Sequence, residues 1–505
     1  MVNLSTIVKL SILAYLFFLL NIMRKNNLLK TTSIMLLSFA ALPFCSSAQT
    51  TRLQLNDLSS FKNPPANWSV AGSVSSDFNK VNSLDKKKGS GILVNINDKK
   101  KNEDIFTNFE HGDIDLSVDF MMPKGSNSGI YLQGRYEIQL LDSWGKENLS
   151  DSDLGAIYHR WDETRPAGQF GFEGVAPRLN VSRAPGLWQN IRIIFQAPKF
   201  DASGKKTANA RVVQVVLNGV SIIENAELQG PTRGSAFPNE AATGPIRIQG
   251  DHGSVAFKNF QYTTTVNTKS PTGAEAKGWV EYKPVYVKVG NEPELLRSFV
   301  DIPEKKRVTH AINVGYPHNI SYSYDLSNGT LFQVWKGGFV DGTPMWLFRG
   351  DGNTTAIGSK LFLNDAPSLA ILDSEKAAWP DTLDAKYGFR SKGYELDEKG
   401  YPTFKYIVNT YNVDDKITSD DGKMLTRQLN IAGPVQKNVY VRAAVATDIT
   451  EAGEGLYSIN NYEYYLQVNK SLKPVIRTSA KGKELLIPVS NNDKGPISVQ
   501  YSLIW

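Results

Sequence analysis

A short alternating segment, residues 127–142, holds the side-chain types best suited to binding a polar substrate. Side chains on a strand alternate between faces, so one face of this segment is apolar, with Ile130, Leu132, Tyr136, Ile138 and Leu140. The other face combines planar hydrogen-bonding groups with an aromatic ring and an Arg–Glu pair: Tyr131, Gln133, Arg135, Glu137 and Gln139. Such a face is either simply solvated or holds sugar hydroxyls, and the absence of Lys, Thr and Ser from it favours the sugar site.

Asp142 is a second carboxylate close to Glu137. A spacing of five residues puts the two on opposite faces of a regular strand, and only a bulge or the strand's end would bring them together. Cleavage of a glycosidic bond by two carboxylates requires both within ~5–10 Å of one another. Asp142 is therefore a candidate catalytic residue and, equally, a candidate turn residue or calcium-type ligand.

Histidine supplies the other candidate acid or base, because imidazole titrates near neutral pH. His159 follows Tyr158 where a predicted strand runs into a loop, and His252 lies in a Gly-Asp-His-Gly turn. The alternative is a hydrogen-bonded loop histidine, which we favour for His111 and His252. For His159 both interpretations stay open.

Several classes of function are excluded by what the sequence lacks. It contains no His-Glu-x-x-His motif, no phosphate-binding glycine loop and no Gly-x-Ser-x-Gly motif. The net charge of +6 comes from scattered Lys and Arg with no basic run interleaved with aromatics, so no nucleic-acid partner is expected. The lone Cys45 lies in the N-terminal segment, so the remaining chain has neither a disulfide nor a thiolate metal site.

Residues 1–48 are predicted to be a targeting segment. From Met23 a basic start leads into an apolar stretch at residues 34–44 and small residues at 46–48, the order of a secretory signal that ends before Gln49. The apolar run at residues 7–22 is short of the ~20 residues of a membrane span, and we interpret it as a mis-assigned extension. We expect a secreted protein, periplasmic or on the outer surface of a Gram-negative bacterium, with no membrane span in its mature chain.

Short alternating segments bounded by turn signals predict an all-β chain of sandwich domains. Strands are expected at residues 113–120, at 212–223 around the turn Asn218-Gly219, and on both sides of a tight loop at 250–253. The polar, breaker-rich stretch at 265–278 is a predicted linker between a first domain at 49–264 and a second large β-sandwich at 279–505.

The second domain offers less evidence of chemistry. Trp335 and Trp346 flank a segment rich in Gly and acids, with Asp341, Asp351 and Asn353 close by. A tight loop beside a tryptophan-filled core explains this pattern better than a cation or sugar site. Carbohydrate binding or structural support is the expected role of this domain.

Several short motifs follow one another in a recognisable order: Asn127–Leu132, Tyr136–Gln139 with Asp142, Gly155–Tyr158, Gly186–Gln189, Leu217–Val220, Gly244–Gln249 with His252-Gly253, and Phe257–Asn259. Together they resemble the 3-keto-disaccharide hydrolase domain family, often labelled as related to family 16 glycoside hydrolases, over roughly residues 60–262. The resemblance implies a concanavalin-like jelly roll and sugars oxidised at C3 as substrates, and Glu137, Gln139 and Asp142 match the family's most recognisable motif. The chain departs from the family in a longer segment at 159–179, and it lacks the Glu-x-Asp-x-x-Glu strand of true family 16 enzymes.

The resemblance implies a chemistry that these residues can support, since a ketone at C3 acidifies the proton at C2. A base can then start elimination of the C1 substituent, and water adds back. The hypothesis assigns Glu137 as base, Arg135 or a divalent metal as polariser of the ketone, and His159 or Tyr158 as proton donor. The metal question is left open, with no ligands assigned and no other cofactor expected. The predicted substrate-binding residues are Asn127, Tyr131, Gln133, Arg135, Gln139, Tyr158, Gln249 and His252.

The alternative function is non-catalytic. Lectins share this sandwich fold, and a fold does not determine an activity. The chain would then be a carbohydrate-binding protein of a polysaccharide-capture system. Carbohydrate is the expected partner under either hypothesis.

Overall fold

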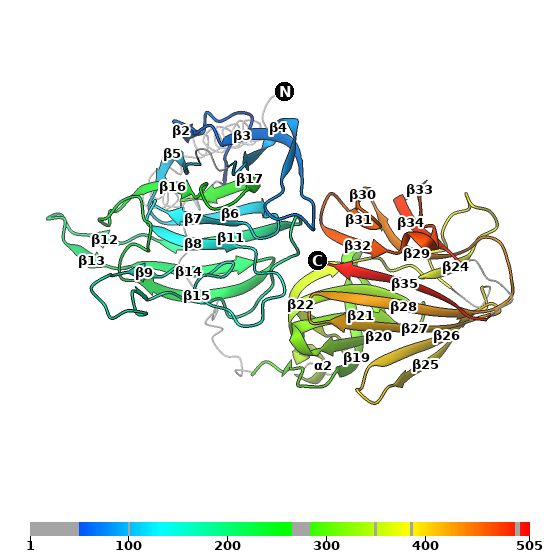
Figure 1. Ribbon diagram of the computed structural model, residues 1–505. Helices are drawn as coiled ribbons and strands as arrows, with labels where there is room; N and C mark the ends of the chain where they lie inside the picture. Colours follow the sequence, from blue (N-terminus) through cyan, green and yellow to red (C-terminus); the bar gives the residue numbers. More distant parts are fainter. Residues whose placement is uncertain (1–49, 99–101, 265–282, 348–350, 384–386, 490–494) are drawn as a thin grey trace, which may run out of the picture. The chain divides into compact units, whose positions relative to one another are not determined.

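The computed structural model describes residues 50–98, 102–264, 283–347, 351–383, 387–489 and 495–505. Its elements are almost all β-strands, which confirms the predicted all-β chain (Figure 1). The predicted targeting segment at 1–48 and the predicted linker at 265–278 lie outside the described residues. Among the helices that are described, none has the length and hydropathy needed to cross a membrane.

Residues 51–263 form a sandwich of two antiparallel sheets, the concanavalin-like jelly roll that the sequence predicts (Figure 1). The five-stranded sheet contains, in spatial order, β2 (Phe61–Lys62), β5 (Ile105–His111), β16 (Gly244–Ile248), β7 (Asn127–Leu132) and β8 (Tyr136–Leu141). The eight-stranded sheet contains β15 (Val220–Leu228), β14 (Ala210–Leu217), β11 (Trp188–Gln196), β6 (Ile114–Met121), β17 (Val255–Thr263), β4 (Asp85–Asn95) and β3 (Trp68–Ser75), with β1 (Thr51–Arg52) paired to β17.

The core between these two sheets confirms the predicted alternation. The apolar set of β7 and β8 is buried against residues of the opposite sheet such as Phe120 and Ile193: Ile130, Leu132, Tyr136, Ile138 and Leu140. The alternate side chains of the same strands therefore lie on the outer face of the five-stranded sheet. The predicted turn is also confirmed, since Asn218 and Gly219 join β14 to β15 with φ values of 50° and 83°.

Two small hairpins extend from this sandwich. One consists of β9 (Arg160–Trp161) and β10 (Gly171–Phe172), and the other of β12 (Lys199–Phe200) and β13 (Lys206–Ala208). The first hairpin is the structure adopted by the longer segment noted in the sequence. It begins directly after the candidate residues Tyr158 and His159.

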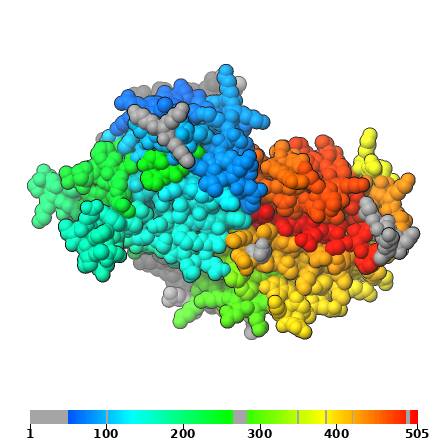
Figure 2. Space-filling model, viewed as in Figure 1, coloured from blue at the N-terminus to red at the C-terminus, as the bar shows by residue number. Residues whose placement is uncertain are grey.

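Residues 286–504, light green to red in Figure 2, form three further antiparallel sheets. The six-stranded sheet contains β18 (Tyr286–Val287), β22 (Thr330–Asp341), β21 (Ile320–Asp325), β20 (Lys306–Tyr316) and β19 (Glu294–Ile302), with β23 (Thr355–Phe362) on β22. The eight-stranded sheet contains β25 (Arg390–Leu396), β26 (Pro402–Val408), β27 (Tyr411–Asp420), β28 (Met424–Ala432), β35 (Ile497–Ile504), β32 (Tyr464–Val468), β31 (Leu456–Ile459) and β30 (Ile449–Gly453). The four-stranded sheet contains β24 (Leu369–Ile371), β29 (Val439–Ala446), β34 (Gly482–Pro488) and β33 (Val475–Ser479).

In the acidic and tryptophan-rich segment of this second part, Trp335 and two carboxylates are engaged within the protein, whereas Trp346 is exposed. Trp335 is fully buried, and Asp341 accepts a hydrogen bond from Thr343 N at the start of the short helix α2 (Thr343–Leu347). Asp351 is paired with Arg307. These contacts hold a loop together and leave these two carboxylates engaged within the protein.

Candidate active site

Four side chains form a row across the outer face of the five-stranded sheet. Tyr131 on β7 lies opposite both Glu137 on β8 and Arg247 on β16. The bridge between Ile138 and Ile157 places Tyr158 opposite Glu137 on its other side, where Tyr158 N donates to Glu137 O at 3.1 Å. Directly opposed residues share a face of a sheet, so strand register alone aligns Arg247, Tyr131, Glu137 and Tyr158.

Glu137 is the buried acid of this row, with an exposed fraction of 2%. Its side chain lies over Gly129, where a Cβ atom would come within 2.3 Å of Glu137 Oε1. The Tyr131 hydroxyl donates a hydrogen bond to the carboxyl group. Oε2 is buried without a hydrogen-bond partner among the residues that the structure describes. A buried polar oxygen without a partner is costly, which marks Oε2 as an atom that a ligand could engage.

Burial raises the pKa of Glu137 to about 8. The Tyr131 hydrogen bond and the Arg247 charge lower this pKa, while the charges of Asp104 and Asp251 raise it. Loss of hydration dominates because an ionised carboxylate is far less stable away from water. The result is a carboxylate that, once ionised, is a stronger base than an exposed glutamate.

Arg247 is a fixed cation beside Glu137. Its guanidinium donates to Asp104 Oδ2 and to Gly234 O, and it lies over the Tyr131 ring at 4.3 Å from the centroid. Asp104 also accepts from Gly250 N at 2.8 Å. A charge-assisted pair with a carboxylate, together with stacking on an aromatic ring, is the arrangement that immobilises an arginine most effectively.

Sequence reasoning did not select Arg247 or Asp104 as site residues. For Arg247 a signal was present, because Ile246 and Ile248 alternate around it and both are buried. That alternation places Arg247 on the outer face with Tyr131 and Glu137. Asp104 precedes β5 and carries no comparable signal, because only the pairing of β5 with β16 brings it to Arg247.

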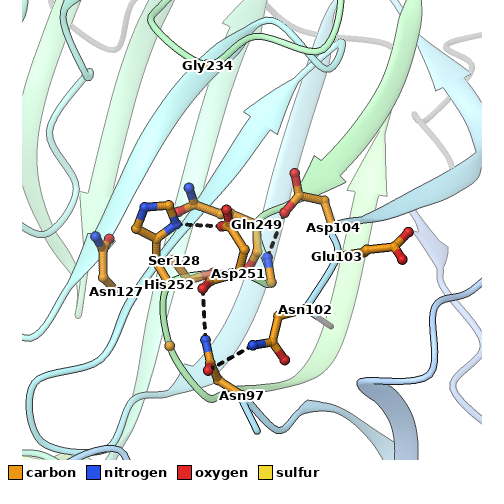
Figure 3. A network of polar contacts seen from close by, with 12 residues as sticks. Asn97, Asn102, Glu103, Asp104, Asn127, Ser128, Gly234, Gln249, Asp251 and His252 are labelled. Carbon is orange, nitrogen blue, oxygen red and sulfur yellow. Dashed lines mark hydrogen bonds and ion pairs between the residues drawn. The ribbon is translucent and has the colours of Figure 1, made fainter. Parts of the chain in front are cut away.

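Two of the predicted substrate-binding residues, Gln139 and Gln249, pair with Gly129. Gln139 is opposite Gly129 in the β7–β8 pair, and turning its amide lets its nitrogen donate to Glu137 Oε1 at 3.0 Å. Gln249 N donates to Gly129 O at 3.0 Å. Figure 3 shows the side chains of Asn127, Gln249 and His252 around the turn at residues 249–252.

His252 is held by its neighbour in the sequence. Its Nδ1 lies 2.5 Å from Asp251 Oδ1, and its side chain is 53% exposed. Asn97 donates to the Asp251 carbonyl from the adjacent loop, as Figure 3 shows. His252 is therefore half-exposed, whereas Glu137 is buried.

Tyr158 and His159 lie together at the other end of the row. Their rings are 4.1 Å apart between centroids, and His159 Nδ1 is 3.2 Å from Asp151 Oδ2. His159 Nε2 is buried with no hydrogen-bond partner among the described residues, under Gly171 of β10. Tyr158 is the direct neighbour of Glu137 in strand register, and the His159 ring lies against the Tyr158 ring.

The structure corrects the expected orientation of Gln133 and Arg135. Gln133 and Gly134 have φ values of 53° and 67° and form the tight turn between β7 and β8, so strand alternation stops there. The Gln133 amide donates to His111 O and Ala242 O. Both residues therefore fasten loops instead of lining the row with Glu137.

Arg135 in particular does not take the position of a ketone polariser. Its Nε donates to Asn239 O at 2.6 Å and its Nη1 to Gln133 O at 2.8 Å, while its guanidinium lies over the Phe237 ring. The cation that affects the charge on Glu137 is Arg247.

Asp142 makes the contacts of a turn residue, which is one of the roles that the sequence left open. Its carboxylate accepts from Gly125 N at 2.9 Å and from Trp144 N at 3.4 Å, just beyond the end of β8. Both hydrogen bonds hold the backbone on either side of the β7–β8 pair. The buried His111 is likewise structural: its Nε2 accepts from Gln133 N, and burial lowers its pKa to about 4.

In the parts of the chain that the structure describes, no group of three or more His, Cys, Asp or Glu side chains could hold a metal ion. The carboxylates near Glu137 are engaged separately, Asp104 by Arg247 and Asp251 by His252. The described residues therefore offer no candidate set of metal ligands.

Comparison with solved structures gives two proteins from Parabacteroides distasonis, both solved as candidate glycosyl hydrolases. One is 23% identical, with 43% of this chain and 91% of that chain covered and a TM-score of 0.30. The other is 21% identical, with 43% and 100% covered and a TM-score of 0.29. A carbohydrate-binding module from Bacillus subtilis is 9% identical, with 39% and 95% covered and a TM-score of 0.19. At such identities and TM-scores these similarities add nothing on substrate or mechanism.

No curated protein matches the chain. A family model does match, over residues 57–263, and its description is 3-keto-alpha-glucoside-1,2-lyase-like domain. The match covers the whole row of side chains around Glu137 and confirms the resemblance seen in the sequence. Residues 57–263 are thus similar to the 3-keto-alpha-glucoside-1,2-lyase-like domain family.

Proposed function

We propose that the first sandwich cleaves glycosides oxidised at C3, with Glu137 as the base that removes the proton at C2. The observation that carries this proposal is the state of the Glu137 carboxyl: buried, with one unpartnered oxygen and a fixed arginine near it. A base with a raised pKa is suited to removing a proton from carbon, because proton transfer becomes more favourable as the base strengthens.

The reaction begins with transfer of the C2 proton to Glu137. The electron pair of the C2–H bond moves toward the C3 ketone to give an enolate, then forms a C1–C2 double bond as the enolate collapses and the C1–O bond breaks with its electrons leaving on the oxygen. Water then adds across the double bond to give the free 3-keto sugar. Negative charge develops on the ketone oxygen in the first step, so a donor or cation aimed at that oxygen lowers the barrier.

Arg247 and the two tyrosines supply the groups that this step needs. Arg247 is the cation closest in register to Glu137, and Asp104 fixes its position. Tyr131 and Tyr158 flank Glu137 on either side and bring two hydroxyl groups to the same face of the sheet. In this arrangement Arg247 replaces Arg135 as the residue that stabilises charge on the ketone.

The test is cleavage of a 3-keto-glucoside and of its unoxidised parent by the protein from Gln49 onward, at a pH above the Glu137 pKa of about 8. We expect cleavage of the keto form only. Glu137→Gln should lower kcat by about 10²–10⁴-fold, the usual contribution of a general base. Glu227→Gln is the matched control, because Glu227 is an exposed glutamate of β15 paired with Arg211.

Two results would contradict the proposal. Full turnover in Glu137→Gln would exclude Glu137 as the base. Binding of both sugars without turnover of either would support the non-catalytic, lectin-like alternative and make Glu137 a recognition residue.

We also propose that the protein is exported, on the strength of the signal-like order of residues 23–48. Expression of the full chain in a Gram-negative host should yield a mature protein in the periplasm or on the outer surface that begins at Gln49. N-terminal sequencing of the recovered protein measures this directly, and an uncleaved cytoplasmic product would contradict it.

A further inference from the structure

A series of neighbouring aromatic rings, in tilted and edge-to-face contact, leads from Tyr158 along the first small hairpin. From Tyr158 the ring centroids are separated by 4.1 Å to His159, 5.8 Å from His159 to Trp161, and 5.4 Å from Trp161 to Phe170. The series begins at the residue directly opposite Glu137 and ends on the hairpin that contains β9 and β10. Trp161 is 37% exposed, an unusual degree for so large an apolar side chain.

A cation accompanies these rings. The Arg233 guanidinium lies 3.8 Å from the centroid of the Trp161 ring, and Arg233 N donates to His159 O at 2.9 Å. Among the residues that the structure describes, no carboxylate is paired with Arg233. Its positive charge is therefore available to a ligand on the hairpin.

The residues beside Arg233 anchor it to the Glu137 site. Thr232 Oγ1 accepts from Glu137 N at 3.1 Å, and Gly234 O accepts from the Arg247 guanidinium. A Cβ atom on Gly234 would lie 3.2 Å from the Tyr131 hydroxyl. The Thr232 hydroxyl thus contacts Glu137 and the Gly234 carbonyl contacts Arg247, while Arg233, between these two residues in the sequence, covers the Trp161 ring.

We propose that Trp161 and Arg233 form a subsite for a planar aromatic leaving group, so that aryl 3-keto-glycosides are substrates. This inference rests on the proposed function of Glu137. The leaving group is attached to C1, one bond from the carbon that loses its proton, so it must lie next to Glu137. Stacking of an aromatic group on a tryptophan is favourable by geometry and by burial of apolar surface.

The charge of Arg233 fits the chemistry of this leaving group. When the C1–O bond breaks, both electrons stay on the oxygen, and an aryl leaving group departs as an aryloxide while the C2 proton remains on Glu137. A guanidinium next to that oxygen stabilises the developing charge. Because an aryloxide is a much weaker base than an alkoxide, this departure depends less on a proton donor.

The first experiment compares 3-keto phenyl glucoside with 3-keto methyl glucoside in Trp161→Ala. We expect KM for the phenyl substrate to rise about tenfold, as for one lost aromatic contact, with kcat nearly unchanged and the methyl substrate unaffected. Trp161→Phe should restore most of the loss, which shows that the ring is what matters. Trp346→Ala is the matched control, since Trp346 is 48% exposed on α2 and is expected to change neither substrate.

Arg233→Gln tests the charge. Its kcat should fall about tenfold or more for phenyl and much less for p-nitrophenyl, whose oxyanion is stable without a cation. Equal loss for phenyl and methyl substrates in Trp161→Ala, or equal loss for both aryl groups in Arg233→Gln, would overturn the subsite.

A binding measurement separates this inference from the proposed function. Calorimetry measures the binding of unoxidised phenyl glucoside to the Glu137→Gln variant and to the double variant that also carries Trp161→Ala. Neither measurement involves turnover. Loss of binding on removal of Trp161 supports the subsite even if the protein cleaves nothing. Turnover of 3-keto-glucosides with unaltered phenyl binding in Trp161→Ala would overturn the subsite and leave the role of Glu137 intact.

Discussion

To act as the proposed base, Glu137 must become ionised in a place where burial excludes most water, and burial opposes ionisation. The fold satisfies them with a glycine at position 129, which leaves room for the carboxyl, and with Tyr131 and Arg247, which partly offset the loss of hydration. Neither group cancels the effect of burial, so the pKa stays near 8. Functional carboxyls commonly have pKa values shifted in this way, at a cost in stability.

This cost should be measurable as a pH-dependent stability difference. Between the ordinary carboxyl pKa of 4.5 and about 8, the folded protein retains a proton on Glu137 that the unfolded chain has released. The free energy of unfolding therefore falls as pH rises through this window, by about 1.4 kcal/mol for each pKa unit. The Glu137→Gln variant has no carboxyl at this position and so lacks this pH-dependent loss of stability. Its Tm should match that of the unsubstituted protein near pH 4.5 and exceed it by a few degrees above pH 8. A Tm difference that does not change with pH would show that Glu137 is ionised normally in the fold.

Gly129→Ala should displace the Glu137 carboxyl without unfolding the protein. A Cβ atom at position 129 would come within 2.3 Å of Glu137 Oε1, so the flexible glutamate must move. A displacement of about 1 Å at a reacting group costs on the order of 10²-fold in rate. We expect kcat to fall by that order while the circular dichroism spectrum and the Tm stay close to those of the unsubstituted protein. Unchanged kcat would mean that the position of this carboxyl does not control the rate.

At the level of elements, the β7–β8 hairpin divides its polar residues between two roles. Along the paired strands, Tyr131, Glu137 and Gln139 share the outer face. At the turn, Gln133 and Arg135 bind the backbone of neighbouring loops. A tight turn with positive φ at both central residues ends the pleat, so face alternation cannot be extrapolated across it.

A matched pair of arginine substitutions tests this division. Arg135→Met removes hydrogen bonds to Asn239 O and Gln133 O, and should lower the free energy of unfolding by about 1.5–3 kcal/mol with kcat little changed. Arg247→Met removes the cation beside Glu137 and should lower kcat by about 10²–10³-fold. Urea denaturation and steady-state kinetics on both variants provide the measurement. The reverse pattern would return the polarising role to Arg135.

At the level of the whole molecule, every residue assigned to the chemistry comes from the first sandwich. The second part of the chain has a buried polar network of its own, in which Arg427 contacts Asp415 and Tyr501, and Tyr324 donates to Asp415. The Arg427 and Asp415 side chains are 2% and 0% exposed. This network is enclosed in a core and serves the stability of the second part.

Arg427→Leu should therefore destabilise the protein without altering the chemistry. Removing one partner of a buried ion pair leaves the other charge uncompensated and costs about 3–5 kcal/mol. Arg307→Leu is the matched control, because Arg307 forms exposed pairs with Asp301 and Asp351 that are each worth about 0–1 kcal/mol. We expect a clear loss of Tm for Arg427→Leu only, with kcat per folded molecule unchanged in both. A loss of kcat in folded Arg427→Leu would connect the second part to the reaction.

The sequence by itself determined the β class, the alternation of β7 and β8, the Asn218-Gly219 hairpin and the family resemblance of residues 57–263. These features are local. Turn residues indicate which backbone angles are favoured, and a hydrophobic period of two indicates which face of a strand is buried. Glu137 could be selected on the same grounds, because it lies within a regular strand.

Only the tertiary structure decided that Arg247 and Asp104 lie beside Glu137 and that Tyr158 lies directly opposite it. Arg247 and Tyr158 reach it through strand pairings over many residues, and Asp104 reaches it only through Arg247. The pKa of Glu137 also depends on burial by segments far away in the chain. Strand register and burial are set by the packing of the whole sandwich, which short-range patterns do not encode.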